Sequence, residues 1–419
     1  MKSLAVNFKD LEGGAARAAF RVHQALRTIG VDSHMLVRGK TSGDWTVETP
    51  YRKPTKLAEM LEVVRPMIGN AVSRVLKTGN VNLHSASVLP SRLPDRINRS
   101  DADVVHLHWV CRETMSVEDI GRITKPVVWT MHDMWGFCGA EHYTEDHRWR
   151  DGYTKTNRPP YEARLDLNRW VWKRKHKAWD RPMTIVTPSR WLADCVRESA
   201  LMRDWTVQTI HNCIDMDAWA PVERSQAREL LGLPRDAKLL LFGAMGGGRD
   251  PRKGMDLLLQ AFESLHGRAD GLELVVFGQA APKDPPALAF PVHYMGHLHD
   301  DLSLRILYSA ADAMLIPSRQ DNLPNTGVEA LACGTPVIAF ATGGLPDIVT
   351  HRQTGWLARA FDPEDLAAGI EWVLSDAARH ATLCANARAE ALARFSYEAV
   401  APQYRSLYER AIAGAGAAA

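Results

Sequence analysis

Long apolar runs, closely spaced cysteines and low-complexity tracts are all missing from this chain of 419 residues. Nowhere do about 18 apolar residues follow one another, which excludes a membrane-spanning helix. The N-terminal stretch MKSLAVNFKDLEGG has charges within and after a very short apolar run, so we expect no secretory signal. The cysteines form no close pair, which favours buried thiols in a reducing, cytoplasmic compartment over a disulfide framework. They are Cys111, Cys138, Cys195, Cys213, Cys333 and Cys384.

A large excess of one charge is also missing, since the net charge of the chain is +2. The two halves nevertheless differ. Residues 1–212 hold 33 Lys or Arg against 24 Asp or Glu, whereas residues 213–419 hold 18 against 25. The basic first half indicates an anionic partner, such as a phosphate-bearing substrate or a membrane surface. Nucleic acid is disfavoured, because no nucleic-acid-binding motif accompanies the charge.

Short β-rich runs alternate with longer stretches of helical periodicity, a pattern typical of parallel sheets covered by helices. We therefore expect an α/β fold with two doubly wound domains, 1–212 and 213–396, and a helix near 397–419 that packs back on the first. The boundary falls in the polar stretch 213–236. Strands are expected at 3–8, 33–37, 103–109, 126–132, 184–189, 207–212, 238–243, 272–278, 313–318 and 336–340. Helices are expected at 254–267, 301–310, 325–333, 363–374, 376–394 and 397–412.

Two segments of the first half combine basic and apolar residues at helical spacing. Residues 52–77 hold six Lys or Arg, and residues 164–181 hold seven, together with Trp170, Trp172 and Trp179. Both segments can rest on anionic lipid headgroups, with the tryptophans at the interface. The alternative is an ordinary amphipathic helix with a solvated basic face. Because proline lacks an amide hydrogen, we expect Pro66 to interrupt the first of these helices.

Phosphate sites are expected where glycines follow a strand and open a helix. Gly13 and Gly14 follow the first strand and allow the backbone to approach a phosphate closely, although such a pair is often only a turn. The second candidate follows the strand at 238–243. There a glycine-rich loop carries Arg249, Arg252 and Lys253 in front of a helix. Since cations beside a helix N-terminus are unfavourable unless an anion lies between, we predict a diphosphate site, the alternative being a solvated loop.

Polar residues gather at the ends of two other expected strands. Asp321 precedes a helix start and Glu329 lies in the first turns of that helix, with the amides of Asn325 and Thr326 between them. The two carboxylates can bind sugar hydroxyls and a ribose, the alternative being a capping or salt-bridge role. His132 and Asp133 stand at the carboxyl end of the strand at 126–132, where ligands of doubly wound sheets bind.

The chain also carries a series of ordered motifs along nearly its whole length. They are Gly-Gly at 13–14, HLHW at 106–109, WTMHDMW at 129–135, TPSRW at 187–191, IHNCID at 210–215, RKG at 252–254, and the block 312–344 with ACGTPVIA and ATGG. With these motifs the chain resembles the retaining glycosyltransferases of family 4. The resemblance implies the GT-B architecture, in which two Rossmann-like domains face each other across a cleft.

The resemblance also implies roles for individual residues. Asp321 stands at the first position of the family motif E-x7-E and would hold the donor sugar hydroxyls, a task that Asn322 can share. Glu329 at the second acidic position would bind the nucleotide ribose. His132 would hydrogen-bond the donor sugar, while Asp133 and the aromatic loop that follows, including Trp135, would shape the acceptor side.

The diphosphate-binding residues depart in part from the family pattern. Lys253 matches the family lysine that grips the diphosphate. Ala244, however, stands where relatives carry an arginine, so Arg249 or Arg252 is expected to replace it. Pro324 removes one amide donor that many relatives direct at the phosphates.

The resemblance further implies a retaining hexosyltransferase that needs no metal and no other cofactor. The donor would be a UDP- or GDP-linked sugar, and the acceptor a glycan, lipid-linked by resemblance to surface polysaccharide assembly enzymes. We expect a cytoplasmic protein that works at the inner face of the membrane. Two other readings stay open: a nucleotide-sugar epimerase on the same scaffold, and a non-catalytic nucleotide-sugar-binding subunit.

Metal-dependent glycosyltransferases carry an Asp-x-Asp motif. The motif occurs at Asp101 to Asp103, just before an expected strand, and at Asp215 to Asp217, which follows a strand at the expected crossing between the domains, so we expect no catalytic metal at either pair. Two sets of residues invite a zinc site without matching a zinc motif, and we expect core and loop histidines instead. They are His106, His108, Cys138 and His142 in one set, and His293, His297 and His299 in the other.

Overall fold

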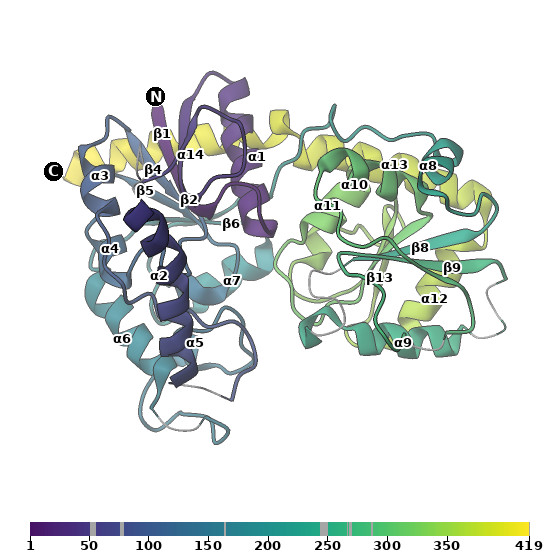
Figure 1. Cartoon of the computed structure of the whole chain (residues 1–419), viewed down its shortest axis with the longest axis horizontal. Coiled ribbons are helices and arrows are strands. Elements are labelled where there is room, and N and C mark those ends of the chain that lie inside the picture. Colours follow the sequence, from purple (N-terminus) through teal and green to yellow (C-terminus); the bar gives the residue numbers. More distant parts are fainter. Residues whose placement is uncertain are drawn as a thin grey trace. The chain divides into compact units, whose positions relative to one another are not determined.

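The computed structural model describes residues 1–50, 56–75, 79–162, 165–243, 250–265, 267, 270–285 and 288–418. It divides the chain into two compact units. Unit 1 contains residues 1–211 and 400–419, and unit 2 contains residues 212–399. Ala244, Arg249 and Arg164 lie outside the described residues. Each unit is a parallel sheet with helices on its faces (Figure 1), so the expected α/β class is confirmed.

The sheet of unit 1 has seven strands in the order β3-β2-β1-β4-β5-β6-β7, and all its paired neighbours run parallel. Its strands are β1 (Lys2–Lys9), β2 (Asp32–Gly39), β3 (Val47–Glu48), β4 (Val104–Leu107), β5 (Val127–Thr130), β6 (Thr184–Thr187) and β7 (Val207–Thr209). Its helices are α1 (Gly14–Thr28), α2 (Lys56–Val75), α3 (Leu93–Arg99), α4 (Val117–Gly121), η1 (Met134–Gly136), α5 (Arg148–Asp151), α6 (Leu167–Ala178), α7 (Arg190–Glu198) and most of α14 (Tyr397–Ala418).

The sheet of unit 2 has six parallel strands in the order β10-β9-β8-β11-β12-β13. They are β8 (Lys238–Gly243), β9 (Leu272–Phe277), β10 (Val292–Tyr294), β11 (Ala313–Ile316), β12 (Val337–Phe340) and β13 (Gly355–Ala358). The helices are α8 (Arg224–Leu231), η3 (Pro251–Lys253), α9 (Met255–Ser264), α10 (Asp301–Ala310), α11 (Asn325–Ala332), η4 (Leu345–Asp347), α12 (Pro363–Leu374) and α13 (Ala377–Phe395).

All the strands expected from the sequence are present, but β3, β10 and β13 were not predicted. Each is an outer strand of its sheet, and the sequences of the three, VE, VHY and GWLA, contain no run of β-branched residues. One prediction was wrong, because α2 runs without interruption through Pro66. The proline removes a single backbone hydrogen bond, and the rest of α2 continues on both sides of it.

The sheet of unit 2 is buried on both faces, which is why its strands are continuous apolar runs rather than alternating ones. Along β8, Leu239 and Leu241 join one core cluster, while Leu240 and Phe242 join another. Because successive side chains of a strand point to opposite faces, the two clusters lie on opposite sides of the sheet.

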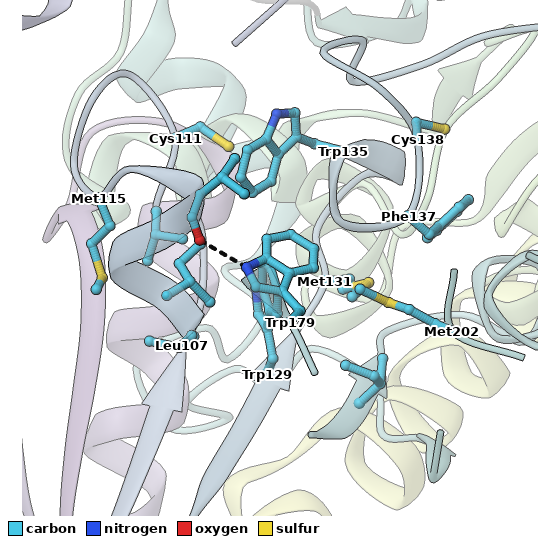
Figure 2. Close-up of a cluster of buried hydrophobic side chains, with 14 of the residues drawn as sticks. Leu107, Cys111, Met115, Trp129, Met131, Trp135, Phe137, Cys138, Trp179 and Met202 are labelled. Atoms are coloured by element: carbon cyan, nitrogen blue, oxygen red, sulfur yellow. Dashed lines mark hydrogen bonds between the residues drawn. The ribbon is translucent and has the colours of Figure 1, made fainter. Parts of the chain in front are cut away.

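The core of unit 1 is rich in tryptophan and surrounds the end of β5 (Figure 2). The rings of Trp129 and Trp179 pack edge to face with centroids 5.3 Å apart, and Trp135 lies beside both. Trp179 donates from its indole nitrogen to the carbonyl oxygen of Val117 over 2.8 Å, as the dashed line in Figure 2 marks. Trp179 is only 5% exposed. The prediction that it lies at a membrane interface is therefore wrong.

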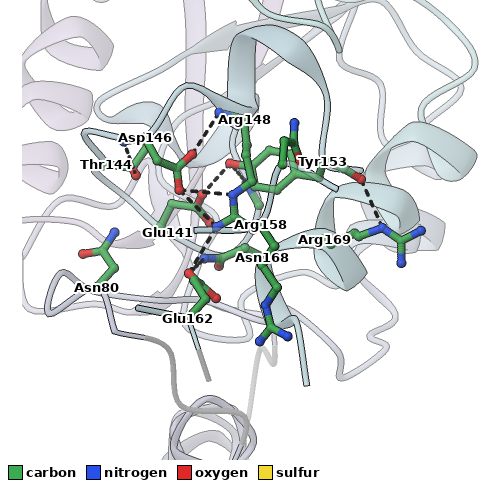
Figure 3. A network of polar contacts seen from close by, with 12 residues as sticks. Asn80, Glu141, Thr144, Asp146, Arg148, Tyr153, Arg158, Glu162, Asn168 and Arg169 are labelled. Atoms are coloured by element: carbon green, nitrogen blue, oxygen red, sulfur yellow. Dashed lines mark hydrogen bonds and ion pairs between the residues drawn. The ribbon is translucent and has the colours of Figure 1, made fainter. Parts of the chain in front are cut away.

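A network of buried charges holds the long connection between β5 and β6 (Figure 3). Arg148 pairs with Asp146 at 3.0 Å, with Glu162 at 3.1 Å and with Asp166 at 3.3 Å. Asn168 donates to Glu162 over 3.0 Å. One guanidinium thus joins three carboxylates across this connection, which fixes a stretch that has little regular structure of its own.

Helix α14 lies against unit 1 from Val400 onward. Two of its tyrosines reach the buried sheet. The hydroxyl of Tyr404 hydrogen-bonds Thr130 at 3.1 Å, and the hydroxyl of Tyr408 hydrogen-bonds His106 at 2.6 Å. The last helix of the chain is therefore tied to β4 and β5, the two strands that lead into the HLHW and WTMHDMW motifs.

Candidate functional site

In unit 2, the basic residues that follow β8 meet the polar loop that follows β11. The two strands are neighbours in the sheet, so the segments at their carboxyl ends lie side by side. Lys253 ends η3, and its Nζ lies 2.5 Å from Oδ2 of Asp321. The hydroxyl of Ser318 lies 3.3 Å from the same carboxylate oxygen. The structure thus brings together two residues that the sequence placed in one donor site.

The backbones of these two segments pack so closely that glycine is required. Gly254 has φ +67°, and a Cβ atom there would lie 1.9 Å from the carbonyl oxygen of Pro317. At Gly343, with φ +56°, a Cβ atom would lie 2.4 Å from the carbonyl oxygen of Asp321. Both positions combine a left-handed conformation with a backbone neighbour that cannot move aside. The position of the Asp321 carboxylate is therefore set by rigid backbone contacts on two sides.

The arginines near Lys253 are engaged in ion pairs. Arg252 pairs with Asp250 at 2.7 Å, and Arg319 pairs with Asp256 at 2.5 Å. The amide of Arg319 also donates to the carbonyl oxygen of Arg252 over 2.7 Å. Arg252 therefore lies beside the predicted diphosphate site with its guanidinium held by a neighbouring carboxylate. Arg249, the other candidate, lies outside the described residues.

Helix α11 starts where the β11 loop ends, and its first turn carries no acidic side chain. Amides of a first helical turn point along the helix axis and favour an anion there. Asn325 accepts a hydrogen bond from Asn212 at 3.2 Å, and Thr326 is half-buried beside it. Asn322 is buried in the preceding loop, and its amide donates to Oδ1 of Asp321 over 3.2 Å.

Glu329 lies in the second turn of α11 and is buried. The hydroxyl of Tyr308, from α10, donates to its Oε2 over 3.0 Å. A buried carboxylate is stable only with hydrogen-bond donors around it, and Tyr308 is one of them. Because a carboxylate has two oxygens with several acceptor directions, Glu329 can accept from further hydroxyl groups.

In unit 1, the predicted glycines lie between β1 and α1. Gly13 has φ +95° and ψ 162°, a conformation that residues with side chains rarely adopt, and Gly14 begins the helix. A Cβ atom added at Gly13 would meet nothing within 4 Å. The Cβ position of Gly13 therefore faces open space, and the role of this turn in phosphate binding stays a prediction.

His132 and Asp133 follow β5 directly. Burial lowers the pKa of His132 to about 4, and its Nε2 lies 3.1 Å from Nδ1 of His108. Asp133 accepts from the amide of Trp135 at 2.9 Å, from the indole of Trp109 at 2.8 Å and from His142 at 2.6 Å. Burial raises the pKa of Asp133, but these donors, His142 first, outweigh it and leave the pKa below its ordinary value. Asp133 thus organises the loop around it.

Trp135 belongs to the core rather than to the surface, since it is 2% exposed and donates to the carbonyl oxygen of Ser85 at 2.9 Å. The side chain of Lys175 packs over the Trp135 ring in a cation–π contact, with Nζ 3.8 Å from the ring centroid. Lys175 is fully buried and donates to the carbonyl oxygens of Trp135, Cys138 and Gly139. Sequence reasoning missed this lysine. A usable signal was present, because Lys175 lies one turn from both Val171 and Trp179 on the apolar face of α6.

No group of three or more His, Cys, Asp and Glu side chains is placed to hold a metal ion within the described ranges. Asp101 pairs with Lys2 at 2.5 Å, and Asp215 caps the turn formed by Asp217. His142 binds Asp133, and His293 binds Glu273 at 2.5 Å.

No helix in the part of the chain that the structure describes is long and apolar enough to cross a membrane.

Two family models match consecutive parts of this chain. The model described as Glycosyltransferase Family 4 matches residues 12–218, and the model described as Glycosyl transferases group 1 matches residues 237–376. Among curated proteins, the chain is 33% identical over 225 residues to D-inositol 3-phosphate glycosyltransferase 2 of Catenulispora acidiphila, covering 49% of this chain and 51% of that one. The corresponding enzyme of Geodermatophilus obscurus is 36% identical over 201 residues, covering 44% and 43%. The chain thus spans about half the length of these relatives.

Solved structures with a similar fold extend over the whole chain. The sucrose-phosphate synthase of Thermosynechococcus elongatus superposes with a TM-score of 0.65 at 19% identity, covering 99% of each chain. HepE of Anabaena, solved in complex with UDP-glucose, gives 0.64 at 16% identity, covering 98% of this chain and 100% of that one. WaaG, a glycosyltransferase involved in lipopolysaccharide biosynthesis, gives 0.58 at 16% identity and covers 98% of each.

These structural matches identify the fold: the two parallel α/β units have the GT-B fold of glycosyltransferases. The chain belongs to the group 1, family 4 glycosyltransferases. The resemblance seen in the sequence motifs is thereby confirmed.

Proposed function

We propose that this protein is a retaining hexosyltransferase that moves a sugar from a nucleotide diphosphate sugar, UDP- or GDP-linked, to a glycan acceptor without a metal ion. The observation that carries the proposal is the meeting of Lys253 and Asp321 beside the start of α11 in unit 2. This arrangement offers one ammonium and the first amides of a helix to a diphosphate, and one carboxylate to the hydroxyls of the sugar attached to it.

The ion pair between Lys253 and Asp321 suggests how the donor is taken up. A diphosphate carries more negative charge than one carboxylate and competes for the lysine ammonium. When Lys253 turns to the diphosphate, Asp321 becomes an acceptor for sugar hydroxyls. Glu329, held by Tyr308, would accept from the ribose hydroxyls, and His132 of unit 1 would bind the sugar.

Transfer then needs positioning and charge stabilisation rather than a protein nucleophile. The bond between the anomeric carbon and the phosphate oxygen breaks, and the diphosphate leaves with the electron pair. Lys253 and the first amides of α11 stabilise the charge that develops on it. The acceptor oxygen attacks the anomeric carbon from the same face, and its proton passes to the departing phosphate oxygen. The configuration of the sugar is retained.

A lipid-linked acceptor and a role in surface polysaccharide assembly form the finer part of the proposal, supported by the involvement of the similarly folded WaaG in lipopolysaccharide biosynthesis and by the surface of unit 1. On α2, Met60, Val63 and Met67 are exposed at helical spacing. Arg65 of the same helix lines a cavity of about 880 Å³, together with Arg38, Arg92, Arg96 and Arg99. Such a surface suits anionic headgroups. The six cysteines form no disulfide bond, which fits the cytoplasmic side of a membrane.

The donor site is tested first by thermal unfolding of the purified protein with UDP, GDP, ADP or dTDP, each with EDTA present. At about 100 times Kd, a nucleotide adds about 2.7 kcal/mol of stability and raises Tm by roughly 5 to 10 °C. We expect one of the four nucleoside diphosphates to raise Tm. In Lys253→Ala and in Glu329→Ala, the same nucleotide should no longer raise Tm. Lys238→Ala, at the opposite end of β8, is the matched control and should keep it. No shift with any nucleotide would overturn the site.

Turnover distinguishes the proposal from its two rivals. Once the nucleotide is identified, sugars linked to that nucleoside diphosphate are incubated with the protein and with lipid-linked or free glycan acceptors. The anomeric configuration of the product is then determined by NMR. A retained configuration supports the proposal. Conversion of the nucleotide sugar into its epimer without an acceptor would show that the protein is an epimerase. Tight binding of the nucleotide sugar without any turnover would show that it is a non-catalytic subunit.

Membrane contact is tested by cosedimentation with vesicles of anionic or neutral lipid. Arg92→Gln with Arg99→Gln should weaken binding to anionic vesicles, whereas Arg197→Gln on α7 should not. Equal binding of all variants to both vesicle types would refute this surface.

A further inference from the structure

Three histidine rings lie next to one another at the carboxyl ends of β4 and β5; the rings of His108 and His132 are stacked, whereas those of His106 and His108 are tilted by 40°. The ring of His108 lies between the other two, with centroids 4.0 Å from His106 and 5.4 Å from His132. His106 and His108 are almost completely buried. Both were expected from the sequence as core or loop histidines rather than as zinc ligands.

The two inner histidines differ in their hydrogen bonds. His106 uses both ring nitrogens, Nε2 toward Thr130 at 2.7 Å and Nδ1 toward Tyr408 at 2.6 Å. His108 uses Nδ1 toward Nε2 of His132 at 3.1 Å. Its own Nε2 is buried and has no hydrogen-bond partner among the described residues. His108 is therefore connected to His132, whereas His106 is connected to α14.

The bond between His108 and His132 can hold only one hydrogen. Burial lowers the pKa of both rings, so both are neutral at neutral pH, and each carries a single hydrogen on one nitrogen. If His132 were the donor, His108 would carry its hydrogen on Nε2, as a buried donor without an acceptor. A buried donor without a partner costs about 1–3 kcal/mol. The arrangement with the hydrogen on Nδ1 of His108 leaves only an acceptor nitrogen unpaired, which is tolerated more often.

We propose that His108 is a positioning residue that donates from Nδ1 to Nε2 of His132 and thereby fixes His132 as the tautomer that carries its hydrogen on Nδ1. His132 then presents a hydrogen-bond donor, not an acceptor, at Nδ1. His108 itself lines a cavity of about 10 Å³, which is far too small for a sugar. Its influence on the reaction therefore passes through His132 and rests on the proposed role of that residue.

NMR of the protein with ring-¹⁵N histidine tests the tautomer directly, and the His132 signals are identified by their loss in His132→Asn. We expect hydrogen on Nδ1 of His132 in the unchanged protein. In His108→Phe, which has no donor, His132 should move to the Nε2–H form. In His108→Asn, whose side-chain amide can donate from a similar place, the Nδ1–H form should persist. His106→Gln is the matched control, equally buried and not bonded to His132, and should leave His132 unchanged.

Two results would overturn the proposal: hydrogen on Nε2 of His132 in the unchanged protein, or the same His132 tautomer in the unchanged protein and in His108→Phe. If His108→Phe does not fold, the unchanged protein and His108→Asn still decide the question. Turnover provides the second readout. We expect kcat to fall about tenfold in His108→Phe, the factor that one hydrogen bond supplies, and to recover in His108→Asn. If His132→Asn leaves turnover intact while the NMR result holds, the role of His132 fails and the tautomer assignment stands.

Discussion

Acid should destabilise unit 1 through its buried histidines, and His106 allows the effect to be worked out for one ring. Burial lowers the pKa of His106 from 6.5 to about 3. Between these values the unfolded chain binds a proton that the folded chain does not bind. The free energy of unfolding therefore falls as the pH falls below about 6.5, and the full contribution of the neutral ring is present above that pH.

The size of the effect follows from the two pKa values. Between pH 7 and pH 5, protonation of His106 in the unfolded chain lowers the free energy of unfolding by about 2 kcal/mol. His106→Gln removes this titration and no other. The variant will be less stable at every pH. Between pH 7 and pH 5, however, its free energy of unfolding should fall by about 2 kcal/mol less than that of the unchanged protein. Titrations common to both proteins cancel in the difference.

Urea unfolding followed by tryptophan fluorescence measures this difference, because ten of the thirteen tryptophans lie in residues 1–211. Unfolding curves are recorded from pH 5 to pH 8 for both proteins. Lys177→Met, at an exposed position of α6, serves as a control for an uninvolved residue. Parallel pH dependences of the unchanged protein and His106→Gln would refute the reasoning, since they would mean that His106 is protonated in the folded chain as readily as in the unfolded one.

Two further predictions concern buried contacts. Lys175→Met should lower the free energy of unfolding by about 3 kcal/mol, because three carbonyl oxygens lose their donor, whereas Lys177→Met should change it little; equal stabilities in urea unfolding would contradict the role of Lys175. Gly254→Ala should cost more stability than Gly267→Ala, since both positions have positive φ but only the Cβ at 254 would meet Pro317, at 1.9 Å. It should also abolish the nucleotide-induced Tm shift. Equal effects of the two alanines would show that the close approach has no consequence.

Much of the fold could be predicted from the sequence because the signals are local. Apolar runs of the right length mark the inner strands, and the helix at Asp301–Ala310 was expected with the same bounds. The outer strands β3, β10 and β13 could not be found, since their short sequences contain no run of β-branched residues and only their pairing with a neighbouring strand defines them.

The candidate site, too, could be predicted only in part from the sequence. The sequence pointed to Lys253, Asp321 and Glu329 through strand ends and motifs, and the first two do meet. It could not show that Tyr308 holds Glu329, because the two residues belong to different helices. It also misjudged Trp179, counted with a membrane-facing set although it lies in the core.

By itself, the sequence determined the family, the parallel α/β class and the strand ends that carry the chemistry, because all of these depend on residue type and spacing along the chain. Only the tertiary structure decided the state of individual polar groups. Lys175 lies inside the core because three carbonyl oxygens and the Trp135 ring receive its ammonium there. His108 donates to His132 because β4 and β5 lie side by side in the sheet. Burial and hydrogen bonding arise from contacts between distant segments, and these contacts set charge and tautomer.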